Sequence, residues 1–383
     1  MLSFGSAAAL LAWVGVLVLP WQPHRVRERL EADPADEDAD LRNVTVLIPA
    51  RDEAEVIGIT IAALARQGRG LHAFVIDDQS SDGTAEVAAR AAAASDAGRL
   101  SLRVVAGRAL PGGWAGKLWA LEQGLAHVER PFTLLLDADI ELAPGMVAAL
   151  VRAAHARSVS LVSIMAELGC ATFWERLLAP AFVFFFKLLY PFGLANDPAK
   201  RTAAAAGGCM LVRTAELRAI GGFAAIRGAI IDDCTLAAKL KANRQPIWVG
   251  VSHSVRSLRP YSGLAGFWGM VSRSAFTQLR YSSALLLLAT ALLVVTLLLP
   301  PIAAASALFD AAVPAAAVVG ASAWAAAAAV YWPTVRFYRL PAPWALTLPV
   351  AAALFLAMTW SSAFGYWRGT RATWKNRSYG SKD

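Results

Sequence analysis

The sequence predicts an α/β protein, with a mostly parallel sheet and flanking helices, that also carries transmembrane helices. Between residues 44 and 144, short apolar runs rich in β-branched residues alternate with helical stretches, which is typical of a sheet buried on both faces. Long apolar segments lie toward both ends of the 383-residue chain. The hydrophobic content of 57% and the mean hydropathy of +0.48 are too high for a soluble enzyme and indicate burial in lipid.

Residues 1–21 are predicted to form a transmembrane anchor. Residues 2–20 are almost wholly apolar and can span a bilayer with a slight tilt. Positive charges follow this run at Arg25, Arg27 and Arg29, whereas a cleavable signal peptide carries them before it. We therefore expect an uncleaved anchor, followed by cytoplasmic residues according to the positive-inside tendency. Residues 22–42 are acidic and rich in alanine, and we expect a charged, solvated linker there.

Acidic residues follow three of the four strands predicted in the first half of the chain. The predicted strands are residues 44–50, 74–78, 102–105 and 132–139, and helices are expected at residues 57–64, 84–94, 117–127 and from Pro144 onward. The acids at the strand ends are Asp52 with Glu53, Asp77 with Asp78, and Asp137 with Asp139. Ligands of parallel sheets bind beyond the carboxyl ends of the strands, so these acids are predicted to share one nucleotide site.

Asp137 and Asp139 are predicted to bind a divalent metal ion. Residues i and i+2 of a strand point to the same face, so the two carboxylates would repel each other unless a cation lay between them. Mg²⁺ and Mn²⁺ prefer oxygen ligands and commonly bridge such groups to substrate phosphates. The alternative is a strand-to-turn junction with solvated acids.

Two features of the second half of the soluble region leave alternatives open. Residues 173–192 are rich in phenylalanine and leucine but are interrupted by charges and a proline, which favours an interfacial helix in the membrane surface over a buried core helix. Asp232 and Asp233 follow an apolar run and begin a predicted helix. Carboxylates there either stabilise the helix N-terminus or include a catalytic base, and the spacing does not distinguish the two.

Residues 281–366 are predicted to contain about three transmembrane helices, near residues 284–308, 311–332 and 340–364. Residues 367–383 form a basic tail. Three crossings after a cytoplasmic domain would place this tail outside, against the positive-inside rule, so the number of crossings stays open.

The charge balance indicates a membrane surface as partner. The formal net charge is +8, from 36 Lys and Arg against 28 Asp and Glu, and much of the surplus lies beside apolar segments. No long basic run interleaved with aromatic residues occurs, so nucleic acid is not expected as a partner. Cys170, Cys209 and Cys234 are odd in number and lack C-x-x-C spacing, which predicts free thiols in a reducing compartment.

Four motifs in this order resemble those of membrane-bound family 2 glycosyltransferases with the GT-A fold. They are P-A-R-D-E at 49–53, I-D-D-Q-S-S-D-G-T at 76–84, D-A-D at 137–139 and I-D-D-C-T-L at 231–236. Within the family, the G-G-W-A-G-K loop at 112–117, the G-G-C-M-L-V run at 207–212 and the W-K-N-R-S-Y tail at 374–379 are similar to hopene-associated glycosyltransferases. Ceramide and carotenoid glycosyltransferases share much of this layout.

Four positions, in three motifs, depart from the family pattern. Asp52 stands where asparagine is usual, and Asp232 replaces the glutamate of the E-D-x-x-L motif. The family's Q-x-x-R-W motif would fall at 277–281, where Arg280 is kept but threonine and tyrosine replace glutamine and tryptophan. This motif marks processive polymer synthesis, so the departure argues against that activity.

The resemblance implies a cytoplasmic GT-A domain over residues 43–280 that transfers a sugar, with inversion, from a nucleotide-diphosphate sugar to a lipid. UDP is the commonest donor nucleotide, and the acceptor would be a hopanoid or another isoprenoid or sphingolipid-like lipid. Asp233 would be the catalytic base, and Asp139, helped by Asp137, would bind Mg²⁺ or Mn²⁺. The donor-binding residues would be Pro49, Arg51, Asp52, Glu53, Asp77, Asp78, Lys117, Asp137, Ala138, Asp232 and Arg280.

Lys117 is either a cation for the diphosphate or a surface lysine. The expected location is the cytoplasmic (inner) membrane, as a multi-pass protein. A polysaccharide synthase and a catalytically silent membrane scaffold are the alternative functions.

Overall fold

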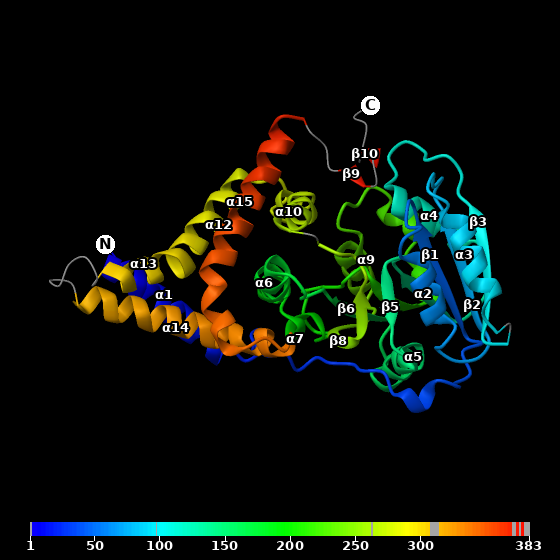
Figure 1. Cartoon of the computed structure of the whole chain (residues 1–383), viewed down its shortest axis with the longest axis horizontal. Coiled ribbons are helices and arrows are strands. Elements are labelled where there is room, and N and C mark those ends of the chain that lie inside the picture. Colours follow the sequence, from blue (N-terminus) through cyan, green and yellow to red (C-terminus); the bar gives the residue numbers. More distant parts are fainter. Residues whose placement is uncertain are drawn as a thin grey trace. The chain divides into compact units, whose positions relative to one another are not determined.

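The computed structural model describes residues 2–96, 98–261, 263–306, 314–369, 373–374 and 377–378. The chain divides into two compact units (Figure 1). The sheet unit comprises Glu28–Leu168, Leu194–Pro260 and Thr373–Asp383, and the helical unit comprises Met1–Arg27, Gly169–Gly193 and Tyr261–Ala372. The expected domain of residues 43–280 therefore differs from the sheet unit, which begins earlier, ends earlier and omits residues 169–193.

The sheet unit contains an eight-stranded mixed sheet, within the described residues, in the order β3-β2-β1-β4-β7-β6-β8-β5. Its strands are β1 (Val44–Ala50), β2 (Leu71–Asp77), β3 (Leu100–Ala106), β4 (Phe132–Leu136), β5 (Ile140–Leu142), β6 (Leu161–Glu167), β7 (Cys209–Arg213) and β8 (Ile247–Ser257). Strands β3, β2, β1 and β4 are parallel, whereas β7 runs antiparallel to β4 and β6. The α/β class is confirmed, but the sequence did not predict β5, β6 or β8.

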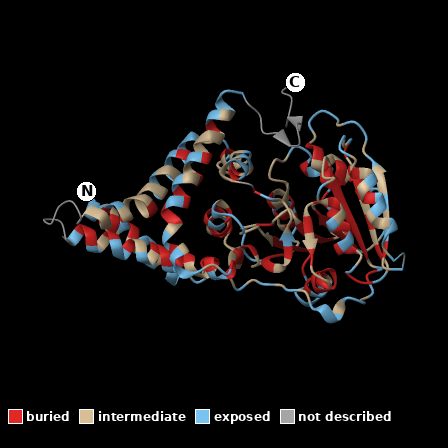
Figure 2. Ribbon diagram, in the orientation of Figure 1, coloured by how far each residue is buried: buried red, intermediate tan, exposed pale blue. Residues whose placement is uncertain are grey.

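Helices cover both faces of the sheet. Val46 and Ile48 of β1 pack toward α2 (Ile57–Leu64), α3 (Thr84–Ala93) and α5 (Met146–Ala156). The intervening Leu47 packs on the opposite face, with α4 (Gly116–Leu125), α8 (Thr214–Ala219) and α9 (Asp232–Ala242). The central strands β1 and β4 are accordingly buried along their length, whereas the edge strand β3 is partly exposed (Figure 2). This layered arrangement fixes the carboxyl ends of β1, β2 and β4 at one edge of the sheet.

Two local expectations are wrong in detail. Helix α5 begins at Met146 after Gly145, whose φ of +82° favours glycine, so Pro144 precedes the helix instead of opening its first turn. Residues 28–42 are not a solvated linker, because Leu41 is buried in the core and the main chain of Leu30 and Glu28 bonds to Val251. The Glu31 carboxylate accepts hydrogen bonds from the N–H groups of His253 and Ser254.

The helical unit contains α1 (Leu2–Val18), α6 (Phe173–Leu189), α10 (Leu264–Ser272), α11 (Ala275–Gln278), α12 (Ser283–Leu293), α13 (Leu299–Ala305), α14 (Pro314–Phe337) and α15 (Leu348–Trp367). Three helical stretches are long and apolar enough to cross a membrane: Ser283–Ala305, Ala315–Phe337 and Ala342–Trp367. They correspond to the three predicted spans, of which residues 307–308 and 311–313 lie outside the described residues. Helix α1 is apolar but shorter, and its role as an anchor stays a prediction. Most of the predicted basic tail also lies outside the described residues.

Helix α6 is packed inside the helical unit. A capping box of Thr172 and Glu175 fixes its start. Phe184 is 1% exposed, and its ring lies 5.0 Å from that of Tyr331 in α14 and 6.4 Å from that of Trp13 in α1. Helix α6 therefore packs against the other apolar helices of its unit, and an interfacial position of residues 173–192 stays a prediction.

Candidate active site

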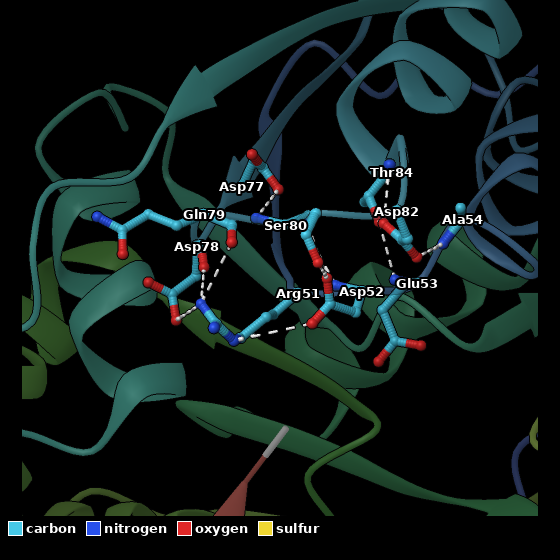
Figure 3. A network of polar contacts seen from close by, with 11 residues as sticks. Arg51, Asp52, Glu53, Ala54, Asp77, Asp78, Gln79, Ser80, Asp82 and Thr84 are labelled. Carbon is cyan, nitrogen blue, oxygen red and sulfur yellow. Dashed lines mark hydrogen bonds and ion pairs between the residues drawn. The ribbon is translucent and has the colours of Figure 1, made fainter. Parts of the chain in front are cut away.

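The loops after β1 and β2 are tied together by polar contacts (Figure 3). Arg51 Nη1 lies 3.9 Å from Oδ2 of the fully buried Asp78 and donates a hydrogen bond to the Asp78 carbonyl. Asp52, whose φ is +51°, donates its N–H to Ser80 Oγ at 3.0 Å and accepts from the Ser81 N–H at 2.8 Å. These contacts hold the two predicted acidic segments side by side.

Asp82 and Thr84 complete this network. The Asp82 carboxylate accepts from the N–H groups of Ala54 and Thr84, at 2.9 and 3.0 Å, and so pairs with the first N–H group of α3. Thr84 Oγ1 accepts from the Glu53 N–H at 2.8 Å. Asp77 Oδ1 accepts from the Ser80 N–H at 3.3 Å, so its carboxylate shapes the turn.

Asp137, Ala138 and Asp139 form a turn between β4 and β5 and not the end of a strand, so the predicted strand 132–139 is three residues too long. Each residue of the turn is held by a segment distant in sequence. The Asp137 N–H donates to the Gly208 carbonyl at 3.0 Å, Thr60 Oγ1 to the Ala138 carbonyl at 2.8 Å, and the Leu258 N–H to the Asp139 carbonyl at 2.7 Å.

Two protein cations pair with the carboxylates of this turn. Lys117 Nζ, at the start of α4, lies 2.7 Å from Asp137 Oδ1 and 3.4 Å from Asp232 Oδ2. Arg259 Nε lies 2.9 Å from Asp139 Oδ2, and its Nη2 lies 3.4 Å from Glu53 Oε1. The Lys117 side chain is only 17% exposed, so the surface-lysine alternative is wrong.

The ionic environment shifts the pKa values of these groups. Burial raises the pKa of Asp137, with Lys117 opposing and Asp139 reinforcing the shift. Burial disfavours the charged form of Lys117, but Asp137 and Asp232 raise its pKa above the ordinary value. Lys117 is therefore a permanent cation between two acids.

Asp233 lies beside this cluster, at the second position of α9. Its Oδ1 accepts from the Cys234 N–H at 2.7 Å, and the Gly207 backbone also hydrogen-bonds to it. Burial, followed by the charge of Asp232, raises the pKa of Asp233 to about 7. Asp233 thus lies in the first turn of α9 and accepts from a free N–H group of that turn, so it also stabilises the helix N-terminus, and its role as a catalytic base stays a prediction.

Gly207 lies close to both Lys117 and Asp233. A Cβ atom at this position would lie 3.3 Å from Lys117 Nζ and 3.4 Å from Asp233 Oδ2. The backbone of the Gly207–Gly208 turn therefore forms one wall of the site, between the D-A-D turn and the start of α9.

The sheet unit brings most of the predicted site residues into one connected network. Ion pairs join Asp232 through Lys117 to Asp137, Asp139 through Arg259 to Glu53, and Asp52 through Arg51 to Asp78. Asp233 and Asp77 are the sequence neighbours of Asp232 and Asp78. Pro49 is buried within β1, where it is opposite Ile76 of β2. Arg280 follows α11 in the helical unit, and its part in the site stays a prediction.

Sequence reasoning missed Arg259, Thr60 and Gly207 as parts of the site. Arg259 had a usable signal, because it follows β8 as the acids follow β1 and β2. Thr60 contributes a hydroxyl group, and Gly207 leaves space because it has no side chain. Neither feature produces a charge pattern in the sequence.

The sequence is similar to a known family over part of its length. Residues 45–221 match the sequence model of Glycosyl transferase family 2. The matched residues form a glycosyltransferase domain similar to those of family 2. The match includes the D-A-D turn and Lys117, whereas Asp232, Asp233 and Arg259 lie beyond it.

Individual relatives of the glycosyltransferase domain are distant. The 4,4'-diaponeurosporenoate glycosyltransferase of Staphylococcus haemolyticus (strain JCSC1435) is 28% identical over 116 residues, which is 30% of this chain and 29% of that protein. A mannosyltransferase from Pyrobaculum calidifontis, solved in complex with GDP-Man and Mn²⁺, aligns with a TM-score of 0.55 and 20% identity over 95% of this chain and 99% of its own. Glucosyl-3-phosphoglycerate synthase from Mycobacterium tuberculosis has a TM-score of 0.43 and 19% identity, with 66% and 86% coverage. The alignment with the mannosyltransferase shows that this chain has a GT-A-like fold.

The D-A-D turn of the glycosyltransferase domain fits a divalent metal only in part. The oxygens of Asp137 and Asp139 are hard ligands of the kind Mg²⁺ and Mn²⁺ prefer. Among the described residues, no group of three or more His, Cys, Asp or Glu side chains is arranged to hold a metal ion. A metal bound here would therefore need substrate oxygens to complete its coordination.

Proposed function

We propose that the chain is a membrane-bound, inverting glycosyltransferase that moves a sugar from a UDP-linked donor to the hydroxyl group of a lipid. The observation that carries this proposal is the position of Asp233, a partly buried carboxyl group, beside the acid–cation cluster of the D-A-D turn. Its pKa, raised to about 7, suits a base at neutral pH.

In this proposal, the residues divide the reaction between them. Arg51 and Asp78 face the nucleotide end, and Asp139 with Asp137 holds Mg²⁺ or Mn²⁺, which supplies positive charge to the leaving diphosphate. Lys117 donates hydrogen bonds to the diphosphate oxygens. Asp233 accepts the proton of the acceptor hydroxyl while that oxygen bonds to the anomeric carbon and the bond to the diphosphate breaks. One displacement of this kind inverts the anomeric centre.

Two observations support a lipid acceptor. Three helical stretches are long and apolar enough to cross a membrane. A relative that matches part of the chain bears the name 4,4'-diaponeurosporenoate glycosyltransferase. We propose an isoprenoid or sphingolipid-like acceptor, with a hopanoid as the first compound to test. Arg25 and Arg27 after α1 support a multi-pass protein of the cytoplasmic membrane whose site faces the cytoplasm.

The decisive experiment compares wild-type protein with Asp233→Asn in detergent, with UDP-sugars, Mg²⁺ or Mn²⁺ and a membrane lipid extract. We expect the variant to lose sugar transfer, measured by mass spectrometry of the lipids, and to keep donor binding, measured by calorimetry. Glu129→Gln changes an exposed acid of the sheet unit and should leave both unchanged. Transfer by Asp233→Asn at the wild-type rate would refute the role of Asp233.

A further inference from the structure

Lys241 gathers one loop of the sheet unit around its ammonium group. It lies in the last turn of α9, the helix that begins with Asp232 and Asp233. Its Nζ lies within hydrogen-bond distance of four backbone carbonyl oxygens, of Ala195 (2.7 Å), Asp197 (2.9 Å), Lys200 (3.0 Å) and Thr202 (2.7 Å). An ammonium group has three N–H donors, so these carbonyls surround it as they would surround a bound cation.

The same loop continues directly into the proposed active site. The Ala205 carbonyl accepts from Cys234 Sγ at 3.4 Å, and the Ala206 N–H donates to Ser163 Oγ at 2.7 Å. Gly207 hydrogen-bonds to Asp233 through its backbone, and the Gly208 carbonyl accepts from the Asp137 N–H at 3.0 Å. Residues 205–208 thus directly follow the segment that Lys241 contacts, and their backbone bonds to Asp233 and Asp137.

The start of the loop is also fixed. Asn196 Nδ2 donates to the Val249 carbonyl at 2.9 Å, and Asn196 Oδ1 accepts from the Val249 N–H at 2.7 Å. Between this attachment and the hydrogen bond of Ala206 to Ser163, the carbonyls of Asp197, Lys200 and Thr202 converge on Lys241. The ammonium therefore replaces the regular hydrogen bonding that a loop of this length lacks.

We infer that Lys241 is a positioning residue, which holds residues 195–202 so that the Gly207–Gly208 backbone stays against Asp233 and Asp137. Its catalytic consequence rests on the proposed function, whereas its effect on the loop does not. Without the ammonium, four carbonyls lose their shared donor and the Gly207 backbone is free to move from Asp233. Since a hydrogen bond to a carboxylate favours the ionised form, its loss raises the pKa of Asp233 further.

The test is Lys241→Met in the full chain, with Lys239→Met as the matched control two residues away on the exposed side of α9. Hydrogen exchange measured by mass spectrometry should become about tenfold faster at residues 203–208 in Lys241→Met and stay unchanged in Lys239→Met. The acidic limb of kcat/KM for sugar transfer should move to higher pH, with a larger change in kcat than in the donor KM. Lys241→Arg, which keeps the charge, should restore part of both effects.

The outcomes separate this inference from the proposed function. Unchanged exchange at residues 203–208 in Lys241→Met would overturn the inference, even if the wild-type protein transfers sugar. If Lys241→Met exchanges faster at residues 203–208 but the wild-type protein transfers no sugar, the positioning role of Lys241 is supported and the proposed function is refuted. If Lys241→Met loosens β1 and β2 as well, Lys241→Arg becomes the deciding variant. Exchange at residues 203–208 that stays as fast in Lys241→Arg as in Lys241→Met, while β1 and β2 return to wild-type exchange, would overturn the inference that a side-chain cation holds this loop.

Discussion

Asp233 sets the expected pH dependence of sugar transfer. Its pKa is raised to about 7, so the carboxylate needed to accept a proton disappears as the pH falls below that value. We expect kcat/KM to fall about tenfold per pH unit below pH 7. In Asp232→Asn the repulsion that helps to raise the Asp233 pKa is lost, so the acidic limb should move to lower pH. Steady-state kinetics between pH 5 and 9 measures both, and a limb that stays in place in Asp232→Asn would contradict this electrostatic coupling.

Lys117 neutralises two partly buried acids, so its removal should cost stability. In Lys117→Met, Asp137 and Asp232 face each other without their shared cation, and we expect a loss of about 2 kcal/mol at pH 8, since partial exposure weakens such pairs. The loss should shrink at pH 5, because the pKa of Asp137 is already raised and protonation removes the repulsion. Urea unfolding at both pH values is the measurement, with Lys117→Arg as the control that keeps the charge. A loss of equal size at both pH values would point to packing instead of charge.

The sequence predicted the acids of the site but not their partners. Asp137, Asp139, Asp78 and Asp233 stand out because each follows an apolar run. Which cation each one meets depends on tertiary contacts: Arg259 reaches Asp139 from the end of β8, more than a hundred positions away in the chain. Such pairings leave no local pattern.

At the level of elements, the Gly207–Gly208 turn connects the D-A-D turn to α9. In Gly207→Ala the new methyl group would crowd Lys117 Nζ and Asp233 Oδ2, and both side chains would have to shift to make room for it. We expect a fall in kcat of about 10²-fold, the size of effect that small misplacements of reacting groups produce, with a nearly unchanged melting temperature. Gly112→Ala is the control, because a Cβ there meets nothing within 4 Å. Equal activities of the two variants would contradict the tight fit at Gly207.

The elements that the sequence predicted well are those with a strong local signal. Strands β1 and β2 and helices α2, α3 and α4 have unbroken apolar runs or stripes bounded by turn residues. The runs of β6 and β8 are apolar and of strand length too, but serine, glycine and histidine interrupt them, and the sequence prediction passed over both. The turn at Asp137–Asp139 is held by hydrogen bonds with Thr60, Gly208 and Leu258, which are distant in sequence, so no local rule ends the strand at Leu136.

At the scale of the whole molecule, the two units are interleaved along the chain. Helix α6 lies between β6 and β7 in sequence but packs in the helical unit, where Phe184 contacts Tyr331 and Phe185 contacts Phe355. Composition alone predicted that apolar helices and an α/β domain coexist. It did not predict that a helix from the middle of the domain's chain belongs to the apolar helices, because charges at Glu175 and Lys187 gave α6 an amphipathic pattern.

This interleaving predicts the behaviour of a truncated protein. A fragment of residues 28–260 keeps α6 but loses its partners in α1, α14 and α15, so an apolar face of phenylalanine side chains is uncovered. We expect the fragment to aggregate in detergent-free buffer and to become monodisperse when detergent is added, as measured by size-exclusion chromatography with light scattering. Replacing Phe184 and Phe185 with serine in the fragment should reduce aggregation. A monodisperse fragment without detergent would show that α6 does not depend on these partners.

The position of α6 in the chain also bears on biosynthesis. Ribosomes add about 5–20 residues per second, and α6 emerges well before α14 and α15, which supply Tyr331 and Phe355. During those seconds its phenylalanines must be sheltered by lipid, by a chaperone or by the insertion machinery, while the neighbouring strands are already available to pair. The nascent chain is therefore most vulnerable to misassembly before its last two long helices are made.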